Sequence, residues 1–395
     1  MPSTGTVFAP QEIPPLTHTL SQSKVNPTWQ ESYLPTKTIQ SHASNLLRLP
    51  NGDLLAAWFG GKQEGIPDIC IYTARLPTGS DTWEPAEKQS HDDQHSEQNP
   101  VLFQTPEGPV WLLWTSQDAG NQDSAIVKKR VSEDGGRSWG NLETLFDEPG
   151  TFIRQPLVVL QNGTWVLPIF RCRSEPGERW IGNDDISCIK SSRDQGNTWQ
   201  ETVVPKSYGA VHMAIVPLKS GTYLGIFRSR WADFVYTSVS EDSVHWSVPK
   251  ATELPNPNAG IGATTLESGK VVLIYNHSSA KGLIEKREGL YDDITPASDT
   301  RKNQKSKHPG KEAFWGAPRA PLCIATSDDE GKTWKSQMLE DGDGFCMTNN
   351  SEQKLNRELS YPSIVTDGKG GVHVAFTFWR QTIKYVRLSS EYFEK

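Results

Sequence analysis

A short turn motif recurs along this chain at the ends of apolar segments, and it restricts the fold more than any other feature. Its pattern is Ser-x-Asp-x-Gly-x-Thr/Ser-Trp, with full copies beginning at Ser132, Ser192 and Ser327, a shortened copy at Ser240 and a degenerate copy over 78–83. In such a turn the Asp accepts hydrogen bonds from backbone N–H groups, the Gly adopts a positive φ, and the Trp covers the base of the next strand. Five copies in register with apolar segments indicate a repeat architecture.

Between the motifs, short apolar segments alternate with Asn-Gly or Gly-rich turns, which are hairpin signals. The first unit has segments at 45–49, 54–59 and 69–73, and the same order occurs six times in all. Helix signals are almost absent. We therefore predict an all-β fold, a six-bladed β-propeller of four-stranded antiparallel blades. A seven-bladed ring, with the extra blade taken from the N-terminal arm or from an insertion, is the alternative.

The repeats divide the chain into an N-terminal arm, residues 1–27, and a single propeller domain, residues 28–395. Residues 1–27 are rich in Pro, Ser and Thr, and we expect a loose arm or a wrap around the outside. The segment 29–39 is expected to supply an outer strand that pairs with the C-terminus and closes the ring.

One insertion, residues 279–318, is too long for a hairpin loop. It is either a solvated loop, which its composition favours, or a lid over the site. In the second case Phe314, Trp315 and Arg319 near its end would reach a ligand. A further insertion, residues 339–358, separates the last two blades.

Composition and charge exclude several function classes. The net charge of −7 predicts no general attraction to nucleic acid or to an anionic membrane, and no apolar run is long enough to span a bilayer. The five scattered cysteines are expected to be free, mostly buried thiols in a reducing compartment. We expect a cytoplasmic monomer without a signal peptide, although non-classical secretion stays open. No cofactor and no metal site are expected, apart from a structural cation that could occupy the central channel.

In a propeller, the starts of the innermost strands and the ends of the second strands meet on one face around the axis. Aligning the six units places guanidinium and imidazole groups at several of these positions. Because arginine captures carboxylates in a bidentate manner, we predict a small cationic pocket for an acidic sugar. The candidate substrate-binding residues are Asn99, Arg154, Arg171, His212, Arg228, His277 and Arg380, and the candidate catalytic residues are His42, His95 and Tyr361.

The turn motif resembles the Asp-box of sialidases and related β-propellers, and the resemblance covers about residues 40–390. It implies that Tyr361 opens the last inner strand as the catalytic tyrosine, with Glu358 behind it. It also implies an acid in the loop after the second strand of blade one, where Glu64 and Asp68 stand. Sialidases carry the first of three arginines in an F/Y-R-I-P motif, whereas this chain has Ser41-His-Ala43 at that place.

A second likeness is to sialidase-like proteins that share short stretches with this chain. The stretches are Trp58-Phe-Gly-Gly, Asn99-Pro-Val-Leu-Phe, Pro255-Asn-Pro-Asn, Tyr275-Asn-His-Ser and Trp379-Arg. Some propeller enzymes of this kind use a histidine on the axis and act where rhamnose is linked to glucuronate. The nearest activity that this likeness implies is that of an L-rhamnose-α-1,4-D-glucuronate lyase.

We favour an enzyme that cleaves a terminal glycosidic bond next to an acidic sugar by β-elimination. Arg154 or Arg228 would neutralise the uronate carboxylate, His42 or His95 would remove the adjacent proton, and a histidine or Tyr361 would protonate the departing oxygen. The first alternative is an exo-α-sialidase-type hydrolase with Tyr361 as nucleophile. The second is a non-catalytic glycan-binding propeller. The expected partner in every case is an acidic oligosaccharide or polysaccharide.

Overall fold

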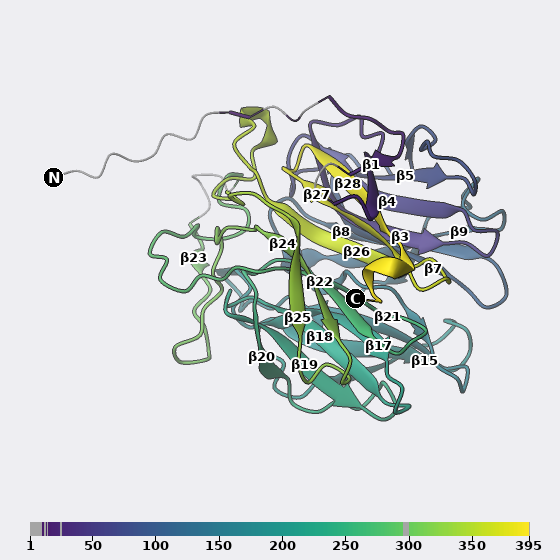
Figure 1. The fold of residues 1–395 in the computed structure, drawn as a ribbon. Helices are drawn as coiled ribbons and strands as arrows, with labels where there is room; N and C mark the ends of the chain where they lie inside the picture. Colours follow the sequence, from purple (N-terminus) through teal and green to yellow (C-terminus); the bar gives the residue numbers. More distant parts are fainter. Residues whose placement is uncertain (1–9, 12, 14, 24–25, 295–299, 395) are drawn as a thin grey trace.

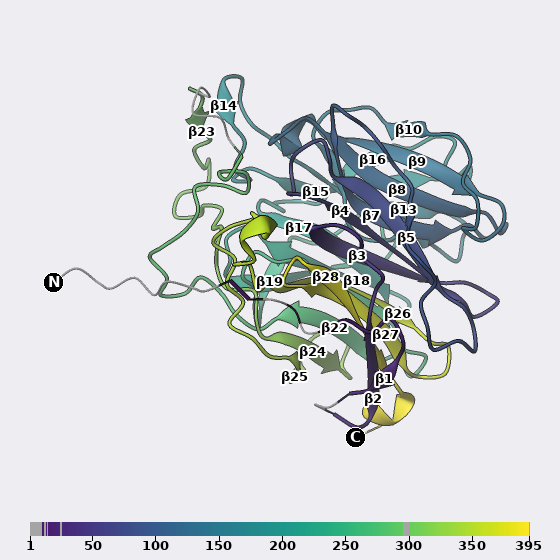
Figure 2. The same ribbon diagram turned by 90° about the horizontal axis from the view of Figure 1, so that it is seen from above.

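The computed structural model describes residues 10–394 apart from 12, 14, 24–25 and 295–299. Six antiparallel sheets follow one another around a central axis, so the six-bladed ring predicted from the sequence is confirmed and the seven-bladed alternative is not needed (Figures 1 and 2). The first three blades are β3 (Gln40–Arg48), β4 (Leu54–Gly61), β5 (Cys70–Leu76) and β6 (Glu87–Lys88); β7 (Ser96–Gln104), β8 (Val110–Gln117), β9 (Ile126–Ser132) and β10 (Glu143–Phe146); and β11 (Thr151–Ile153) with β12 (Val158–Val159), β13 (Trp165–Arg171), β15 (Ile186–Ser192) and β16 (Gln200–Val203).

The next two blades keep the same order, and the described residues also include three short 3₁₀ turns. Blade four is β17 (Ala210–Pro217), β18 (Tyr223–Ser229), β19 (Phe234–Ser240) and β20 (Lys250–Pro255); blade five is β21 (Gly262–Thr265), β22 (Val271–Asn276), β24 (Leu322–Ser327) and β25 (Lys335–Glu340); the turns are η1 (Gln122–Ser124), η2 (Ser351–Gln353) and η3 (Ser390–Tyr392). In the described part of the chain, no helix has the length and apolar character needed to cross a bilayer.

The sixth blade joins the two ends of the chain. It contains β26 (Leu359–Thr366), β27 (Val372–Phe378) and β28 (Thr382–Leu388) from the C-terminal part. Its outer strand is β2 (Trp29–Tyr33), which runs antiparallel to β28 with Trp29 opposite Leu388 and Tyr33 opposite Lys384. The predicted closing strand is therefore present, and β1 (Ser21–Gln22) extends the same sheet outward. The described part of the arm thus packs on the outside of the ring, while residues 1–9 lie outside the described residues.

Separate apolar clusters hold the blades together. Each of the six interfaces between neighbouring blades has its own cluster of buried side chains. Trp83 of blade one, for example, packs edge-on against Tyr385 of blade six, and Trp111 of blade two packs with Trp165 of blade three. All five cysteines are buried and free, as expected.

The turn motifs form the closed turns that the sequence predicts. In the first full copy, Ser132 Oγ donates to Asp134 Oδ1 at 2.8 Å, and the same carboxylate accepts from the backbone and side chain of Ser138 at 2.8 and 2.6 Å. The copies that begin at Ser192 and Ser327 repeat these bonds. The motif therefore fixes the connection between the third and fourth strands of its blade.

The motif glycine also joins neighbouring blades. A Cβ on Gly136 of blade two would lie 2.7 Å from Leu55 of blade one, and one on Gly196 of blade three would lie 2.6 Å from Trp111 of blade two. Both glycines have a positive φ, 84° and 85°. Glycine is therefore required at this position for two reasons: the backbone has a positive φ, and a Cβ would clash with a side chain of the neighbouring blade.

The long insertion is a structured cover. We use the name insertion cover for its described residues, 279–294 and 300–318. The cover is paired to the loop after β13 through two short parallel strands, β14 (Glu178–Arg179) and β23 (Lys302–Asn303). Its Leu290, Tyr291 and Trp315 are buried in one apolar cluster with side chains of blades two, three and four. The prediction of a solvated loop, which the composition favours, is therefore wrong, because these aromatic and aliphatic side chains are buried against the ring.

Candidate active site

Four of the six inner strands carry the same irregularity. In β3, β7, β17 and β26 two residues face a single residue of the second strand, which is a β-bulge. The first residue of each bulge has a positive φ, an unfavourable conformation for residues other than glycine. These residues are Ala43 (57°), Asn99 (47°), His212 (56°) and Tyr361 (51°). Bulges of this kind re-aim side chains, and they lie where the inner strands meet.

Tyr361 lies at the centre of the resulting cluster, which we name the hub. The ring centroid of His42 is 4.3 Å from that of Tyr361, and the ring of His212 is 5.6 Å away. Arg154 and Arg228 place their guanidinium carbons 5.4 and 5.3 Å from the same ring. Side chains from blades one, three, four and six therefore meet around one phenol, and the structure brings together five of the ten candidates: His42, Arg154, His212, Arg228 and Tyr361.

A buried ionic network forms one side of the hub. Arg319, just beyond the insertion cover, donates from Nη1 to Glu358 Oε2 at 2.5 Å. Arg380 donates from Nε to the other oxygen of Glu358 and from Nη1 to Glu64 Oε2 at 2.6 Å. Burial alone would raise the pKa of Glu358, but the charges of Arg380 and Arg319 hold it well below its ordinary value. The positive charges of two arginines thus balance the negative charges of two carboxylates. Arg380 is the sixth of the ten candidates that lies in the hub.

The other two arginines of the hub have no carboxylate partner among the described residues. Arg154 donates from Nη2 to backbone carbonyl oxygens, including that of Tyr361 at 3.0 Å. Arg228 donates to Asn258 Oδ1 at 2.7 Å and to Tyr361 Oη at 2.5 Å. Burial lowers the pKa of Arg154 to about 10 and that of Arg228 to about 9. Arg154 Nε and Arg228 Nη2 are buried without an acceptor. The hub therefore holds an excess of two positive charges and unused donors.

Both histidines of the hub are neutral. Burial, with the charge of Arg380 added for His42 and that of Arg228 for His212, lowers both pKa values well below 6.5. Arg380 Nη2 lies 3.3 Å from His42 Nε2, and because a guanidinium only donates, Nε2 must be the acceptor. The proton of His42 therefore sits on Nδ1, which lies 2.8 Å from Thr377 Oγ1. The Nε2 lone pair can therefore take a proton once the hydrogen bond from Arg380 is given up.

Three candidates lie outside the hub. His95 is 37% exposed and pairs with Asp92 and Asp118 at 2.9 and 3.5 Å. Arg171 is the last residue of β13 and donates to Glu201 on the outer strand β16. His277 is exposed and bonds Tyr275 within blade five. The geometric placement of these three at the hub was wrong, because the side chains of Arg171 and His277 turn toward the outer strands and His95 stays at the rim.

Of the remaining positions, Asn99 is buried in the bulge of β7, and its Oδ1 has no partner. Asp68, one of the two suggested acids, is exposed and accepts from the backbone of Lys62 at 2.8 Å. Glu64, the other one, is in the ionic network. No three His, Cys, Asp or Glu side chains within the described ranges gather to hold a metal ion, and a cation in the central channel stays a prediction.

The hub is closed. Each of its charged or aromatic side chains is at most 5% exposed, and Trp315 of the insertion cover lies with its ring 5.7 Å from the guanidinium carbon of Arg228. The second insertion adds contacts, since Gln40 donates to Asn349 O at 2.9 Å and to Ser351 Oγ at 2.8 Å. A ligand reaches Tyr361 only after parts of these covers move.

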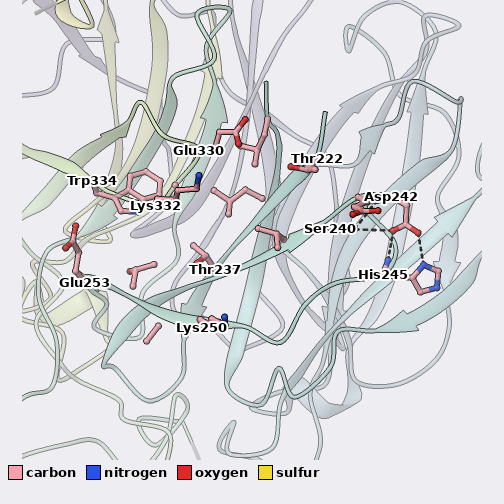
Figure 3. A pocket seen from close by; sticks show the side chains of 17 residues that line it. Thr222, Thr237, Ser240, Asp242, His245, Lys250, Glu253, Glu330, Lys332 and Trp334 are labelled. Carbon is pink, nitrogen blue, oxygen red and sulfur yellow. Dashed lines mark hydrogen bonds and ion pairs between the residues drawn. The ribbon is translucent and has the colours of Figure 1, made fainter. Parts of the chain in front are cut away.

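A surface cavity of about 940 Å³ lies elsewhere, between the outer parts of blades four and five (Figure 3). Trp334 and exposed charged side chains such as Glu253 and Lys332 line it, and His245 is bound to Asp242 of its own turn motif. Size alone does not make it the active site, because it lacks the buried, charge-imbalanced groups of the hub.

Fold and site together define a six-bladed β-propeller with Asp-box turns and a cationic, aromatic centre. The chain belongs to the BNR repeat-like domain family, whose family model matches residues 52–374. No curated protein matches it.

Solved structures share the fold. A Hadza microbial sialidase has a TM-score of 0.66 at 14% identity, over 90% of this chain and 66% of that chain. A protein of unknown function from Dyadobacter fermentans has a TM-score of 0.66 at 15% identity, over 92% and 100%. The NanB sialidase of Streptococcus pneumoniae has a TM-score of 0.61 at 11% identity, over 91% and 70%. This chain thus spans about two thirds of the length of the two sialidases. At these identities the likeness establishes the architecture alone.

Proposed function

We propose that the protein is a carbohydrate-active enzyme that binds the carboxylate of an acidic sugar in the hub. The observation that carries this proposal is the pair of buried guanidinium groups, Arg154 and Arg228, with no carboxylate partner in the described residues. A buried charge without a counter-ion is costly, and an anionic ligand removes that cost. Sialidases are among the structural neighbours, which is consistent with a glycan substrate.

Cleavage by β-elimination fits the protonation states of the hub best. The carboxylate of a uronic acid on Arg154 and Arg228 makes the proton on the adjacent carbon more acidic, because the guanidinium charges stabilise the enolate that forms. His42, neutral in the closed hub, takes that proton on Nε2 in exchange for the hydrogen bond that it accepts from Arg380. The bond between the neighbouring carbon and the glycosidic oxygen then breaks as the carbon–carbon double bond forms.

The departing sugar oxygen needs a proton. Tyr361 can give it, because its Oη accepts from Arg228 and so retains its own hydrogen as a donor. The ring of His212 lies 5.6 Å from this phenol, with Nε2 3.5 Å from Arg228 Nη1. It replaces His95 as the second histidine within reach. We favour a rhamnosyl-glucuronate as the substrate, on the likeness of the short sequence stretches given above.

Hydrolysis of the exo-α-sialidase type is the alternative. It requires a base for Tyr361 and a carboxylic acid that donates a proton. Both carboxylates of the hub, Glu64 and Glu358, are ion-paired with arginine, and Glu358 has a pKa well below its ordinary value. Glu64, the suggested acid within the hub, is paired with Arg380. Glu358, the suggested base, makes its described hydrogen bonds with Arg319, Ser360 and Arg380 and not with Tyr361, which favours elimination.

The test is to incubate the protein with a rhamnosyl-glucuronate glycan and to follow ultraviolet absorbance. Elimination produces an unsaturated uronate and raises the absorbance, and Tyr361→Phe lowers the rate. Release of free sialic acid from a sialoside, together with no rise in absorbance when the rhamnosyl-glucuronate glycan is the substrate, would show that the reaction is hydrolysis and not elimination. Binding of either glycan without turnover would indicate the glycan-binding alternative.

A further inference from the structure

One threonine contacts both the imidazole of His42 and the backbone beside it. Thr377 lies on β27, the second strand of blade six, and is fully buried. Its Oγ1 is 2.8 Å from His42 Nδ1 and accepts from the backbone N–H of Ala43 at 3.1 Å. Both partners belong to β3 of blade one. A single hydroxyl of the last blade therefore holds two neighbouring groups of the first blade.

The directions of these hydrogen bonds follow from what each group can do. A hydroxyl oxygen can accept two hydrogen bonds, and the N–H of Ala43 occupies one of these positions. Because Arg380 donates to Nε2 of His42, the ring proton is on Nδ1, and Thr377 Oγ1 accepts it. The tautomer of His42 is therefore set from both ring nitrogens.

The two hydrogen bonds of the ring differ in what the proposed reaction does to them. The bond from Arg380 is given up when Nε2 takes a proton. The bond to Thr377 is kept, because Nδ1 carries its hydrogen in the neutral and in the charged imidazole alike. Of the two hydrogen bonds that the structure describes for the His42 side chain, the one to Thr377 is thus the one that lasts through the proton transfer.

Thr377 also supports the backbone from which His42 projects. Ala43, the next residue, has a φ of 57° and begins the bulge of β3. A buried N–H without an acceptor is costly, and the bulge interrupts the ladder of hydrogen bonds to β4 at this point. The hydroxyl of Thr377 supplies the acceptor, so it stabilises the conformation that aims His42 into the hub.

Blade two has a threonine at the same place but without a histidine. Thr377 is paired with Ser360 directly before the bulge of β26, and Thr115 is paired with Gln98 directly before the bulge of β7. Thr115 is also fully buried, yet its Oγ1 donates to the carbonyl oxygen of Gln98 in its own blade, at 3.0 Å. The position alone therefore does not direct a threonine hydroxyl to the next blade.

We propose that Thr377 is a positioning residue for the reaction of the hub. Its hydroxyl keeps the proton of His42 on Nδ1 and so keeps Nε2 available as the proton acceptor. This inference rests on the proposed function, because it takes His42 as the base. Since Thr377 acts through His42, its loss should affect kcat and not KM.

The kinetic test uses Thr377→Val, which removes the hydroxyl and keeps the branched shape. With a rhamnosyl-glucuronate glycan we expect kcat to fall about tenfold at unchanged KM, which corresponds to one hydrogen bond of about 1.4 kcal/mol. Thr377→Ser should restore the wild-type kcat. Thr115→Val is the matched control and should leave kcat nearly unchanged. An equal fall in the two valine variants, or a rise in KM alone, would show that the hydroxyl of Thr377 does not act through His42.

A spectroscopic measurement separates this inference from the proposed reaction. Nuclear magnetic resonance of protein labelled with nitrogen-15 histidine locates the ring protons, and His42→Ala identifies the signals of His42. We expect a proton on Nδ1 that exchanges slowly with water in the wild type and in Thr377→Ser, and that shifts or disappears in Thr377→Val. This pattern supports the positioning role even if no product forms, in which case only the proposed reaction is wrong.

A wild-type His42 with its proton on Nε2 would overturn the inference, even if the glycan is cleaved. So would an Nδ1 proton that exchanges as fast as those of the exposed His91, or one that is the same in Thr377→Val. The first two outcomes are measured on the wild type, so the test stands even if Thr377→Val does not fold.

Discussion

The imidazole of His42 lies against the phenol of Tyr361, with ring centroids 4.3 Å apart and ring planes at 51°. The two residues come from the first and the last blade, so the contact exists only once the ring has closed. It places a proton acceptor and a proton donor next to each other, beside two guanidinium groups that have no counter-ion in the described residues.

His42→Ala should lower kcat by about 10² to 10⁴, the usual contribution of a general base. His95→Ala removes a rim histidine that does not contact the hub, and it should leave kcat within about twofold. Steady-state kinetics of both variants check the assignment. A larger loss in His95→Ala than in His42→Ala would transfer the role of base to His95.

Glucuronate should raise the melting temperature of the protein, because a ligand that binds only the folded state stabilises it by about 2.7 kcal/mol at one hundred times its Kd. Glucose, which lacks the carboxylate, is the matched control and should have little effect. In Arg228→Met the shift with glucuronate should largely disappear. A similar shift with both sugars would show that the carboxylate is not what is recognised.

Two arginines of the hub should differ in their effect on stability. Arg380→Met leaves Glu358 and Glu64 buried with less compensation, and it should lower the free energy of unfolding by about 3–5 kcal/mol. Arg228→Met removes a buried charge that has no such partner, at the cost of hydrogen bonds to Asn258 and Tyr361, so the loss should be clearly smaller. Urea unfolding of both variants measures the difference, and equal losses would contradict the charge excess.

Acid should destabilise the protein below about pH 6.5. His42, His212 and His373 have lowered pKa values in the folded state, to about 4 for His373, mainly because of burial. The unfolded chain therefore binds more protons in this window, and stability falls as the pH falls, by about 1.4 kcal/mol per pH unit for each neutral histidine. The lowered pKa of Glu358 adds a loss only at more acidic pH.

Urea unfolding at pH 7.5 and at pH 5 measures this slope. His373→Gln should reduce the slope by about one third, whereas His91→Gln, at an exposed side chain, should leave it unchanged. A stability that does not change between the two pH values would show that these imidazoles are not neutral and buried.

Glycines of the turn motif should tolerate alanine poorly. Gly196→Ala imposes the strain of a positive φ, 85°, and brings a Cβ to 2.6 Å from Trp111 of the preceding blade. Gly163 has a similar φ, 81°, but no atom within 4 Å, so Gly163→Ala should show the backbone strain alone, about 1–2 kcal/mol. Thermal unfolding should show the larger loss in Gly196→Ala, and equal losses would contradict the interblade contact.

The six-bladed ring and part of the hub could be predicted from the sequence. The turn motifs and hairpin signals mark every blade, and Tyr361 and His42 stand at inner-strand starts that can be aligned. Arg171 and His277 could not be placed in the same way, because neighbouring side chains on a strand point to opposite sides and a shift of one residue reverses the direction.

The docking of the two insertions on the ring was harder to predict. Arg319 follows an insertion without periodicity, and the burial of Tyr291 and Trp315 depends on partners in three different blades. Lone aromatic residues in a polar segment were the available signal. They indicate that such a segment docks somewhere, although not on which surface.

The pairing of β2 with β28 has a consequence for biosynthesis. About 350 residues separate these partners, so at 5–20 residues per second the early strand waits for roughly 20 to 70 s before the late one leaves the ribosome. During that interval β2 is an unpaired edge and a template for wrong association with other nascent chains. Chaperone dependence and aggregation of truncated products should therefore extend over most of translation and end only when β28 has emerged.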